Sequence, residues 1–199
     1  MVCPGGAYHF LALGGEGLSV ADFLNAQGWD AVVLEYTHGG GNGVPESEVR
    51  AKAVQDALAA FSLLRQSAEK LDLHTEKLGM MGFSAGGHLT ARTVHELGAA
   101  SPISKEILIY PAYLDAPGGI NNDVRPPAGI KTQLFVSIGG KDAPPWIASS
   151  KVYADAAKAN GQDAEYHFLP GIPHAFDMKP GDPATTAAFL QNLAAFLAK

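Results

Sequence analysis

The chain alternates short apolar runs with longer segments in which apolar side chains recur at helical spacing. The short runs are continuous and rich in valine, isoleucine and leucine, as is typical of parallel strands buried on both faces. Met1–Cys3 has the character of the end of a further strand. The predicted strands are Asp30–Tyr36, Leu78–Gly82, Glu106–Tyr110, Gln133–Gly139 and Ala164–Leu169.

The segments between the strands predict helices, several of which end just before a glycine, a residue common after a helix C-terminus. Strand and helix therefore alternate, which predicts an α/β fold with a parallel sheet and helices on both faces. Without an internal repeat or a break in composition, residues 1–199 are expected to form a single domain. The predicted helices are Leu18–Gln27, Glu46–Ala68, Gly86–Leu97, Trp146–Asn160 and Pro183–Ala198.

Two stretches predict loops. His38-Gly39-Gly40-Gly41-Asn42-Gly43 is rich in glycine but lacks the Lys-Ser/Thr ending of a phosphate-binding loop, so a plain surface loop is expected. Residues 112–131 carry prolines, glycines and asparagines among which no helix fits. We therefore expect no sizeable cap domain and a shallow, open site.

Composition and charge narrow the classes of function. Apolar residues make up 47 % of the chain and charged residues 17 %, which is ordinary for a folded soluble protein. The net charge of −6 argues against nucleic acid as a partner, because phosphate binding needs a basic face. A single cysteine, Cys3, excludes an intrachain disulfide and is expected to be a small buried hydrophobe.

Localisation and metal content follow from what the sequence lacks. Its apolar runs are shorter than the ~20 residues that span a bilayer, and no basic and apolar leader opens the chain. The expectation is a cytoplasmic protein with no membrane partner. His38, His74, His95 and His167 do not show the spacing of metal ligands, so we expect no metal.

The most specific motif is Gly82-Phe83-Ser84-Ala85-Gly86, which lies between a predicted strand and a predicted helix. In that context the pattern G-x-S-x-G predicts a nucleophile elbow, a sharp turn that raises a serine hydroxyl above the edge of the sheet. Flanking glycines allow the tight bend and leave room for a substrate. Ser84 is therefore the predicted nucleophile.

Asp142 and His174 each follow a later predicted strand, in the order Ser, Asp, His. Loops at the carboxyl ends of parallel strands line one crevice, so these three side chains are expected to converge. His174 is the predicted base that activates the serine, and Asp142 is predicted to orient the imidazole. The alternatives to Asp142 are Asp115, Asp155, Asp163 and Asp177, of which the last three suit solvent.

The chain resembles the α/β-hydrolase superfamily, and within it the small bacterial esterases that include acetylxylan esterases and related carbohydrate acyl esterases. The resemblance covers nearly the whole chain and implies a three-layer sandwich with a mostly parallel sheet. It rests on Cys3-Pro4-Gly5-Gly6-Ala7-Tyr8, Glu16-Gly17, Met81–His88, Asp142 and Gly171–His174.

Against that pattern the N-terminal hairpin is missing, and Met1 falls inside the third strand. Ala31–Leu34 is then expected to form an edge strand. Because an exposed apolar edge invites pairing with another chain, we expect a homo-oligomer that covers it.

The resemblance also suggests roles around the serine. Backbone N–H groups of Gly6 and Ala7 are expected to form an oxyanion hole with that of Ala85, which follows the nucleophile. Glu16 is expected to anchor the oxyanion loop, and His88 to pack behind the elbow. The expected substrate-lining residues are Tyr8, His9, Tyr113 and Trp146.

Taken together, these patterns predict a serine carboxylesterase that hydrolyses short-chain, acetyl-like esters, including sugar acetates, without a cofactor. Its partner is expected to be a small-molecule or carbohydrate ester. Two alternatives stay open: a peptidase of the same superfamily, and a catalytically silent hydrolase fold that serves as a binding protein.

Overall fold

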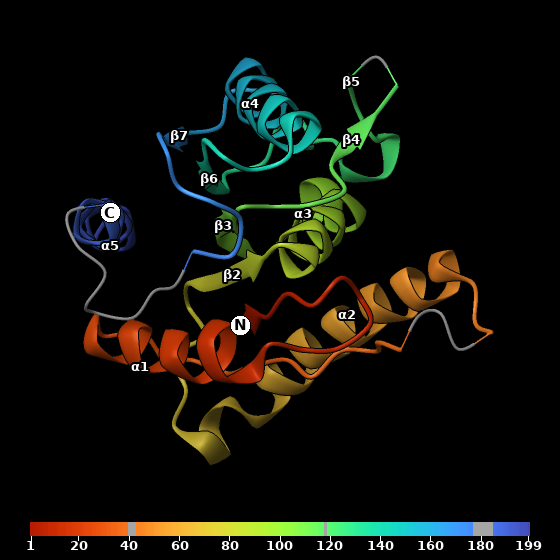
Figure 1. Ribbon diagram of the computed structural model, residues 1–199. Helices are drawn as coiled ribbons and strands as arrows, with labels where there is room; N and C mark the ends of the chain where they lie inside the picture. The colour runs from red at the N-terminus through yellow and green to blue at the C-terminus, as the bar shows by residue number, and fades with distance from the viewer. Residues whose placement is uncertain (40–42, 118, 177–184) are drawn as a thin grey trace.

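A parallel five-stranded sheet in the order β1-β2-β3-β6-β7 lies at the centre of the structure. This computed structural model describes residues 1–39, 43–117, 119–176 and 185–199 (Figure 1). Every pairing in the sheet is parallel, so the predicted α/β architecture is confirmed. The strands are β1 (Val2–Cys3), β2 (Leu78–Phe83), β3 (Ile103–Ile109), β6 (Gln133–Gly139) and β7 (Ala164–Leu169).

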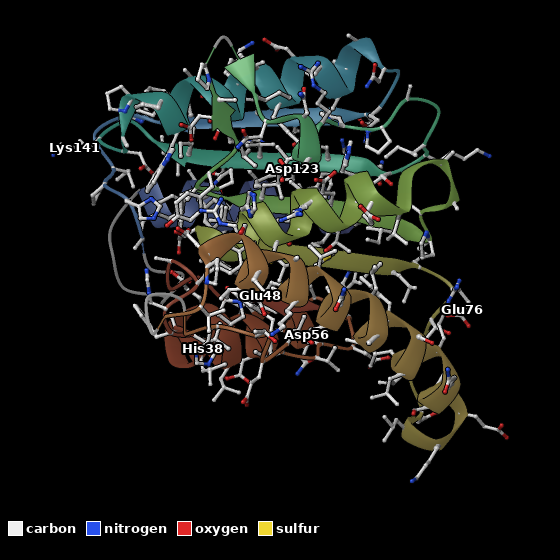
Figure 2. All side chains as sticks on the ribbon, turned by 90° about the vertical axis from the view of Figure 1, so that its right-hand side faces the viewer. His38, Glu48, Asp56, Glu76, Asp123 and Lys141 are labelled. Carbon is white, nitrogen blue, oxygen red and sulfur yellow. The ribbon has the colours of Figure 1, made fainter. Side chains whose placement is uncertain are left out.

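Helices cover both faces of this sheet (Figures 1 and 2). Most of the predicted helices are found within a few residues of their expected bounds, although the start of the predicted Pro183–Ala198 lies outside the described residues. A six-residue π-helix, Leu13–Leu18, precedes the first α-helix. The α-helices are α1 (Ser19–Ala26), α2 (Glu46–Leu71), α3 (Ala85–Leu97), α4 (Pro144–Ala159) and α5 (Thr185–Leu197).

Successive side chains of each central strand enter different halves of the core, because side chains alternate across a strand. Phe135 on β6 packs in the layer under α1 and α5, together with Phe189 and Phe196. Its neighbour Leu134 packs in the layer under α3 and α4, together with Tyr153. Burial on both faces explains why these strands are continuous apolar runs in the sequence.

The predicted strand Asp30–Tyr36 is wrong in its extent. It makes a single parallel bridge, between Val33 and Val2. The Val2 N–H donates to the Val32 carbonyl at 2.8 Å, and the Leu34 N–H donates to the Val2 carbonyl at 2.9 Å. Because β1 has only two residues, it offers no longer ladder for this segment to join.

The stretch predicted as a loop, 112–131, contains no α-helix among its described residues. It holds a two-stranded antiparallel sheet of β4 (Asp115–Ala116) and β5 (Gly119–Ile120), and then a short 3₁₀ turn, Asn122–Val124. In the other predicted loop, residues 40–42 lie outside the described residues. Neither loop supplies a cap domain in the part of the chain that the structure describes.

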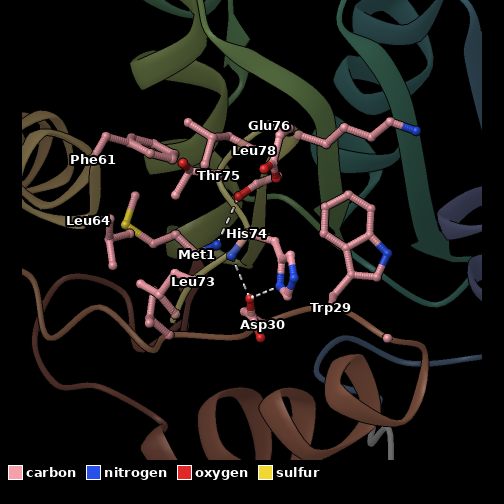
Figure 3. A pocket seen from close by; sticks show the side chains of 14 residues that line it. Met1, Trp29, Asp30, Phe61, Leu64, Leu73, His74, Thr75, Glu76 and Leu78 are labelled. Carbon is pink, nitrogen blue, oxygen red and sulfur yellow. Dashed lines mark hydrogen bonds and ion pairs between the residues drawn. The ribbon is translucent and has the colours of Figure 1, made fainter. Parts of the chain in front are cut away.

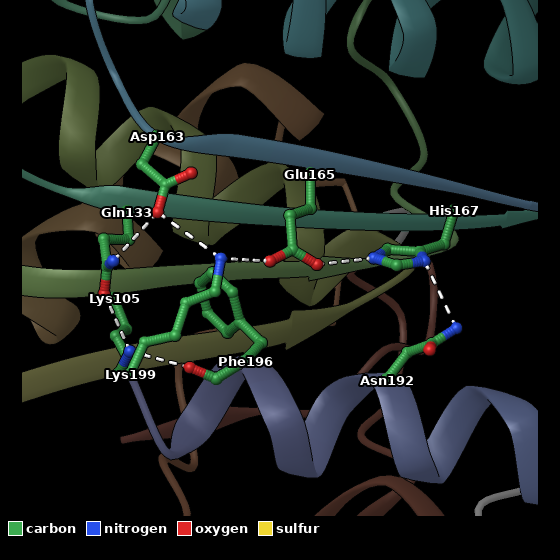
Figure 4. A network of polar contacts seen from close by, with 8 residues as sticks. All are labelled: Lys105, Gln133, Asp163, Glu165, His167, Asn192, Phe196 and Lys199. Carbon is green, nitrogen blue, oxygen red and sulfur yellow. Dashed lines mark hydrogen bonds and ion pairs between the residues drawn. The ribbon is translucent and has the colours of Figure 1, made fainter.

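A polar network fastens α5 to the sheet (Figure 4). The Lys105 ammonium donates to Gln133 Oε1 and to the Phe196 carbonyl, both at 2.8 Å. The Lys199 ammonium lies 2.6 Å from Glu165 Oε1. These contacts hold the end of the chain against β3, β6 and β7, which carry residues of the site at their far ends. None of the described helices is long and apolar enough to cross a membrane.

Candidate active site

Ser84 occupies a strained turn between β2 and α3, with φ 49° and ψ −114°. Such a backbone is unfavourable for a residue with a side chain and persists only where its surroundings hold it. Here the Ser84 N–H donates to the Ile109 carbonyl at 3.0 Å, and the Ser84 carbonyl accepts from the N–H groups of His88 and Ala112 at 3.1 Å. The predicted elbow is therefore present and fixed to the neighbouring strand.

The glycines of the elbow are required by close packing. A Cβ at Gly82 would lie 2.0 Å from the Gly86 carbonyl oxygen. A Cβ at Gly86 would lie 1.9 Å from the Cys3 carbonyl oxygen. Strand, turn and helix approach one another too closely here for any larger residue, which gives the sequence pattern its physical reason.

The structure brings Ser84, His174 and Asp142 together in one hydrogen-bonded chain. His174 Nε2 lies 2.9 Å from Ser84 Oγ, and His174 Nδ1 lies 2.7 Å from Asp142 Oδ2. The Asp142 side chain is 1 % exposed, whereas the His174 side chain is 31 % exposed. A buried carboxylate fixes the imidazole, and the imidazole faces the hydroxyl, which is the geometry of general-base activation of a serine.

The alternative carboxylates lie elsewhere. Asp155 pairs with Lys151 on the surface of α4, and Asp163 accepts from Gln133 and lies near Lys199. Asp115 lies in β4, and Asp177 lies outside the described residues. Among the described acids, Asp142 is the one that contacts His174.

Aromatic rings surround the imidazole. The Tyr110 ring lies 5.0 Å from His174 and 4.7 Å from Phe176, measured between centroids and in T-shaped geometry. The Trp146 ring lies 5.0 Å from His174 and 5.9 Å from Tyr113. Trp146 thus lies beside the imidazole and Tyr113 lies against Trp146, while their expected role in lining the substrate stays a prediction. The sequence analysis missed two of these rings. Tyr110 directly follows the end of β3, and Phe176 lies shortly after the predicted base His174.

We call Gly5–Ala12 the oxyanion loop, after the role that the sequence analysis predicts for it. The Ala12 N–H donates to the Gly5 carbonyl at 3.0 Å, and the N–H groups of His9 and Phe10 donate to the Gly6 carbonyl. Gly6 has φ 133°, and a Cβ there would lie 2.0 Å from the Phe10 carbonyl oxygen, so this turn requires glycine.

The oxyanion loop lies directly beside Ser84. A Cβ built on Gly5 would come within 2.9 Å of Ser84 Cβ. Among the hydrogen bonds of the described residues, none uses the N–H of Gly6, Ala7 or Ala85. Backbone donors of this kind, one of them at the N-terminus of α3, are suited to bind an anion.

Glu16 connects the oxyanion loop to the rings around His174. One carboxylate oxygen accepts from the Gly5 N–H at 2.5 Å, and the other accepts from the Tyr110 hydroxyl at 2.9 Å. The expected anchor is therefore present, and the structure adds Tyr110 to it.

Tyr8 does not fit the expected role of a substrate-lining residue. Its side chain is 0 % exposed, and its hydroxyl lies 2.7 Å from His88 Nδ1. The reason is the backbone: Ala7 and Tyr8 have φ 54° and 62°, a left-handed pair that the sequence did not reveal. By contrast, His9 is exposed.

His88 and Cys3 are buried, as expected. Burial, with help from Arg50 and Arg92, lowers the pKa of His88 to about 3, so its imidazole is neutral. Burial raises the pKa of the Cys3 thiol to about 12, which keeps it protonated and unreactive. In the described part of the chain, no three His, Cys, Asp or Glu side chains are grouped to hold a metal ion.

Two cavities differ in their relation to this site. One of about 340 Å³ is lined by Trp29, Phe61 and Leu78, with the Asp30–His74 pair at its rim (Figure 3). It lies at the amino ends of the strands: Glu76, which lines it, and Lys141, next to Asp142, stand at opposite ends of the molecule in Figure 2.

The second cavity, of about 210 Å³, adjoins the hydrogen-bonded chain. Its lining includes Phe83 and Ala175, the neighbours of Ser84 and His174 in the sequence, together with Glu16, Tyr110 and Phe176. Although it is smaller than the first cavity, it lies against the sequence neighbours of Ser84 and His174.

Comparison with known proteins agrees with this architecture. A family model described as alpha/beta hydrolase fold matches residues 43–127. An acetylxylan esterase from Xylanibacter ruminicola is 36 % identical over 88 residues, which are 44 % of this chain and 17 % of that protein. Endo-1,4-beta-xylanase B from Butyrivibrio fibrisolvens is 34 % identical over 89 residues, 45 % of this chain and 13 % of that protein. The match thus spans less than a fifth of either curated relative.

Solved structures match along almost the entire chain. A thermophilic esterase from Thermogutta terrifontis, with butyrate bound, has a TM-score of 0.80 at 22 % identity, covering 98 % of this chain and 81 % of that one. A sugar hydrolase from Lactococcus lactis has a TM-score of 0.78 at 21 % identity, covering 98 % and 86 %. Sheet, elbow and these similarities together show that the chain has the α/β-hydrolase fold and is a distant homologue of an acetylxylan esterase over the matched residues.

Proposed function

We propose that this protein is a serine carboxylesterase that cleaves short-chain, acetyl-like esters through an acyl-enzyme. The observation that carries the proposal is the hydrogen-bonded chain of Ser84, His174 and Asp142. The N–H groups of Gly6, Ala7 and Ala85, which donate in no hydrogen bond among the described residues, belong to segments next to Ser84 and add support. Two of the similar proteins, an acetylxylan esterase and the butyrate-bound esterase, point in the same direction.

The first half-reaction uses each of these groups. Ser84 Oγ attacks the ester carbonyl carbon while its proton passes to His174 Nε2, and the carbonyl π electrons move onto oxygen. Backbone N–H groups of Gly6, Ala7 and Ala85 stabilise the resulting oxyanion, and each donor lowers the activation barrier by roughly 3 kcal/mol. When the carbonyl re-forms, the bond to the alcohol oxygen breaks, and the alcohol takes the proton from the imidazolium.

The second half-reaction repeats these steps with water. The oxygen of a water molecule attacks the acyl carbon while His174 accepts a proton from that water. Ser84 Oγ then leaves the acyl carbon and takes this proton from the imidazolium. Asp142 accepts from His174 Nδ1 and stabilises the imidazolium that forms twice in each cycle.

The surroundings favour a small acyl group. The cavity of about 210 Å³ between Phe83, Tyr110 and Phe176 accepts the acyl chain, and its size suits acetyl to butyryl rather than a long lipid chain. Trp146, Tyr113 and His9 are at least partly exposed, and we assign them to contact with the alcohol part. Their flat rings suit a sugar, so sugar acetates are the proposed natural class.

A series of p-nitrophenyl esters from acetyl to octanoyl tests the reaction and the acyl length together. The acetyl and butyryl esters are expected to turn over fastest, Ser84→Ala to abolish turnover, and the exposed control Ser47→Ala to leave it unchanged. Hydrolysis that survives in Ser84→Ala would overturn the assignment. Cleavage of a peptide amide but of no ester would favour the peptidase, and no turnover of either would favour a silent binding protein.

We also propose that the protein forms a homo-oligomer through Ala31–Leu34, which are only half buried. Since Val2 bonds to Val32 and Leu34, the N–H and C=O of Val33 between them point away from β1 and are available to another strand. Light scattering is expected to show an oligomer that Val33→Pro, which removes that N–H, dissociates. A monomeric wild-type protein would contradict the proposal.

A further inference from the structure

Tyr8 joins the oxyanion loop to the helix that carries the elbow. Its hydroxyl lies 2.7 Å from Nδ1 of His88, which stands in the first turn of α3, four residues after Ser84. The two rings also meet edge to face, with centroids 5.8 Å apart and an interplanar angle of 87°. One end of this contact is two residues from Gly6, and the other is three residues from Ala85.

Both partners of this hydrogen bond are almost fully buried, so losing the bond would be costly. Tyr8 is 0 % exposed and His88 is 1 % exposed. A polar group buried so deeply is costly if its partner is removed, so the bond selects one arrangement of loop and helix. Burial lowers the pKa of His88 to about 3, so the imidazole is neutral near pH 7 and Nδ1 can accept the hydrogen bond from Tyr8.

The loop conformation needs such an anchor. Ala7 and Tyr8 are successive non-glycine residues with positive φ, a backbone that L-residues avoid unless their surroundings hold it. The Tyr8 carbonyl accepts from the Gly39 N–H at 2.9 Å, which holds the main chain. The contact with His88 holds the side chain and thereby fixes the direction of the N–H groups just before it.

We propose that the Tyr8–His88 hydrogen bond is a positioning device that keeps the Gly6 and Ala7 N–H groups in register with the Ala85 N–H. The inference rests on the proposed esterase function. Tyr8 and His88 act as positioning residues: neither touches the ester, and both act through the oxyanion hole, whose donors must be aligned before the reaction.

The kinetic test compares Tyr8→Phe with Tyr153→Phe. The control, which lies on α4, also loses a buried tyrosine hydroxyl, which donates to Glu106 Oε1 on β3 at 2.7 Å. For p-nitrophenyl acetate we expect kcat of Tyr8→Phe to fall at least tenfold, with KM within about twofold and the pH profile unchanged. Inhibition by a trifluoromethyl ketone, which adds to the serine and places an oxyanion in the hole, weakens by a similar factor. Tyr153→Phe keeps wild-type kcat.

Substitutions of His88 test the other partner. His88→Asn places an amide near the position of Nδ1 and is expected to keep most of the wild-type kcat. His88→Leu is expected to lose at least tenfold. Equal kcat in Tyr8→Phe and wild type, or equal losses in His88→Asn and His88→Leu, would overturn the proposal.

A readout without substrate separates this proposal from the esterase function. Hydrogen exchange of the backbone amides in the oxyanion loop is expected to accelerate in Tyr8→Phe and not in Tyr153→Phe. If wild type hydrolyses no ester, the function fails while exchange still reports the anchor. If wild type is active and neither exchange nor kcat changes in Tyr8→Phe, the positioning proposal is wrong while the esterase function stands. Should Tyr8→Phe not fold, the two His88 variants decide the question.

Discussion

Glu106 gives the sharpest stability prediction, because this carboxyl is buried in the sheet without a full set of partners. It lies on β3 and is 0 % exposed. Oε1 accepts from the Tyr153 hydroxyl at 2.7 Å, whereas Oε2 is buried with no hydrogen-bond partner among the described residues. Desolvation by burial raises the pKa of Glu106 from 4.5 to about 8, and the bond from Tyr153 opposes that shift only in part.

The magnitude follows from proton linkage. Between pH 4.5 and about 8 the folded state keeps the proton on Glu106 and the unfolded state has lost it. The free energy of unfolding therefore falls as pH rises, by about 1.4 kcal/mol per pH unit. The raised pKa of Glu106 thus contributes stability that is fully present below pH 4.5, the pKa in the unfolded state. This stability is lost as the pH rises to about 8, the pKa in the folded state. By pH 7 the loss amounts to about 3 kcal/mol.

Glu106→Gln removes this titration. The glutamine amide oxygen still accepts from Tyr153, and the side chain has nearly the same shape but cannot ionise. Urea unfolding at a series of pH values from 5 to 8.5 is expected to show the variant gaining on wild type by about 3–5 kcal/mol across the series. The exposed control Glu69→Gln stays parallel to wild type. Parallel curves for Glu106→Gln and wild type would refute the reasoning.

Two further predictions concern the site. Asp142→Asn should lower kcat by roughly 10⁴-fold with little change in KM, since the imidazole loses its orientation and its counter-charge. A much smaller drop in kcat, measured by steady-state kinetics, would contradict this role of Asp142. Gly6→Ala should abolish turnover and cost about 1–3 kcal/mol in urea unfolding, because its Cβ meets the Phe10 carbonyl oxygen at 2.0 Å. The open position Gly14, where a Cβ meets nothing within 4 Å, provides the matched Gly14→Ala control, and equal effects of the two changes would contradict the account.

Much of the fold was predictable because its strands are buried on both faces. Burial makes them continuous apolar runs, and glycines or prolines mark the turns between them. The elbow was predictable for a related reason: Gly82 and Gly86 stand where strand, turn and helix come too close for any other residue. Such requirements leave a local trace in the sequence.

Features that depend on a distant partner left no such trace. Asp30–Tyr36 has the composition of a strand, but a strand needs a ladder, and two-residue β1 provides one bridge. Tyr8 was expected to face substrate and is buried instead, because two left-handed residues redirect it toward His88 on another element. Tyr110 follows β3 and His174 follows β7, so the two meet only when β6 pairs with both of these strands.

Covalent labelling with a fluorophosphonate, followed by mass spectrometry, tests the central assignment most directly. The reagent modifies a serine only where a base removes its proton and donors stabilise the charged oxygen. We predict one label for each chain, on the peptide that contains Ser84, formed at least a hundredfold more slowly in His174→Ala. A folded wild-type protein that stays unlabelled, or carries the label on another residue, would contradict the account.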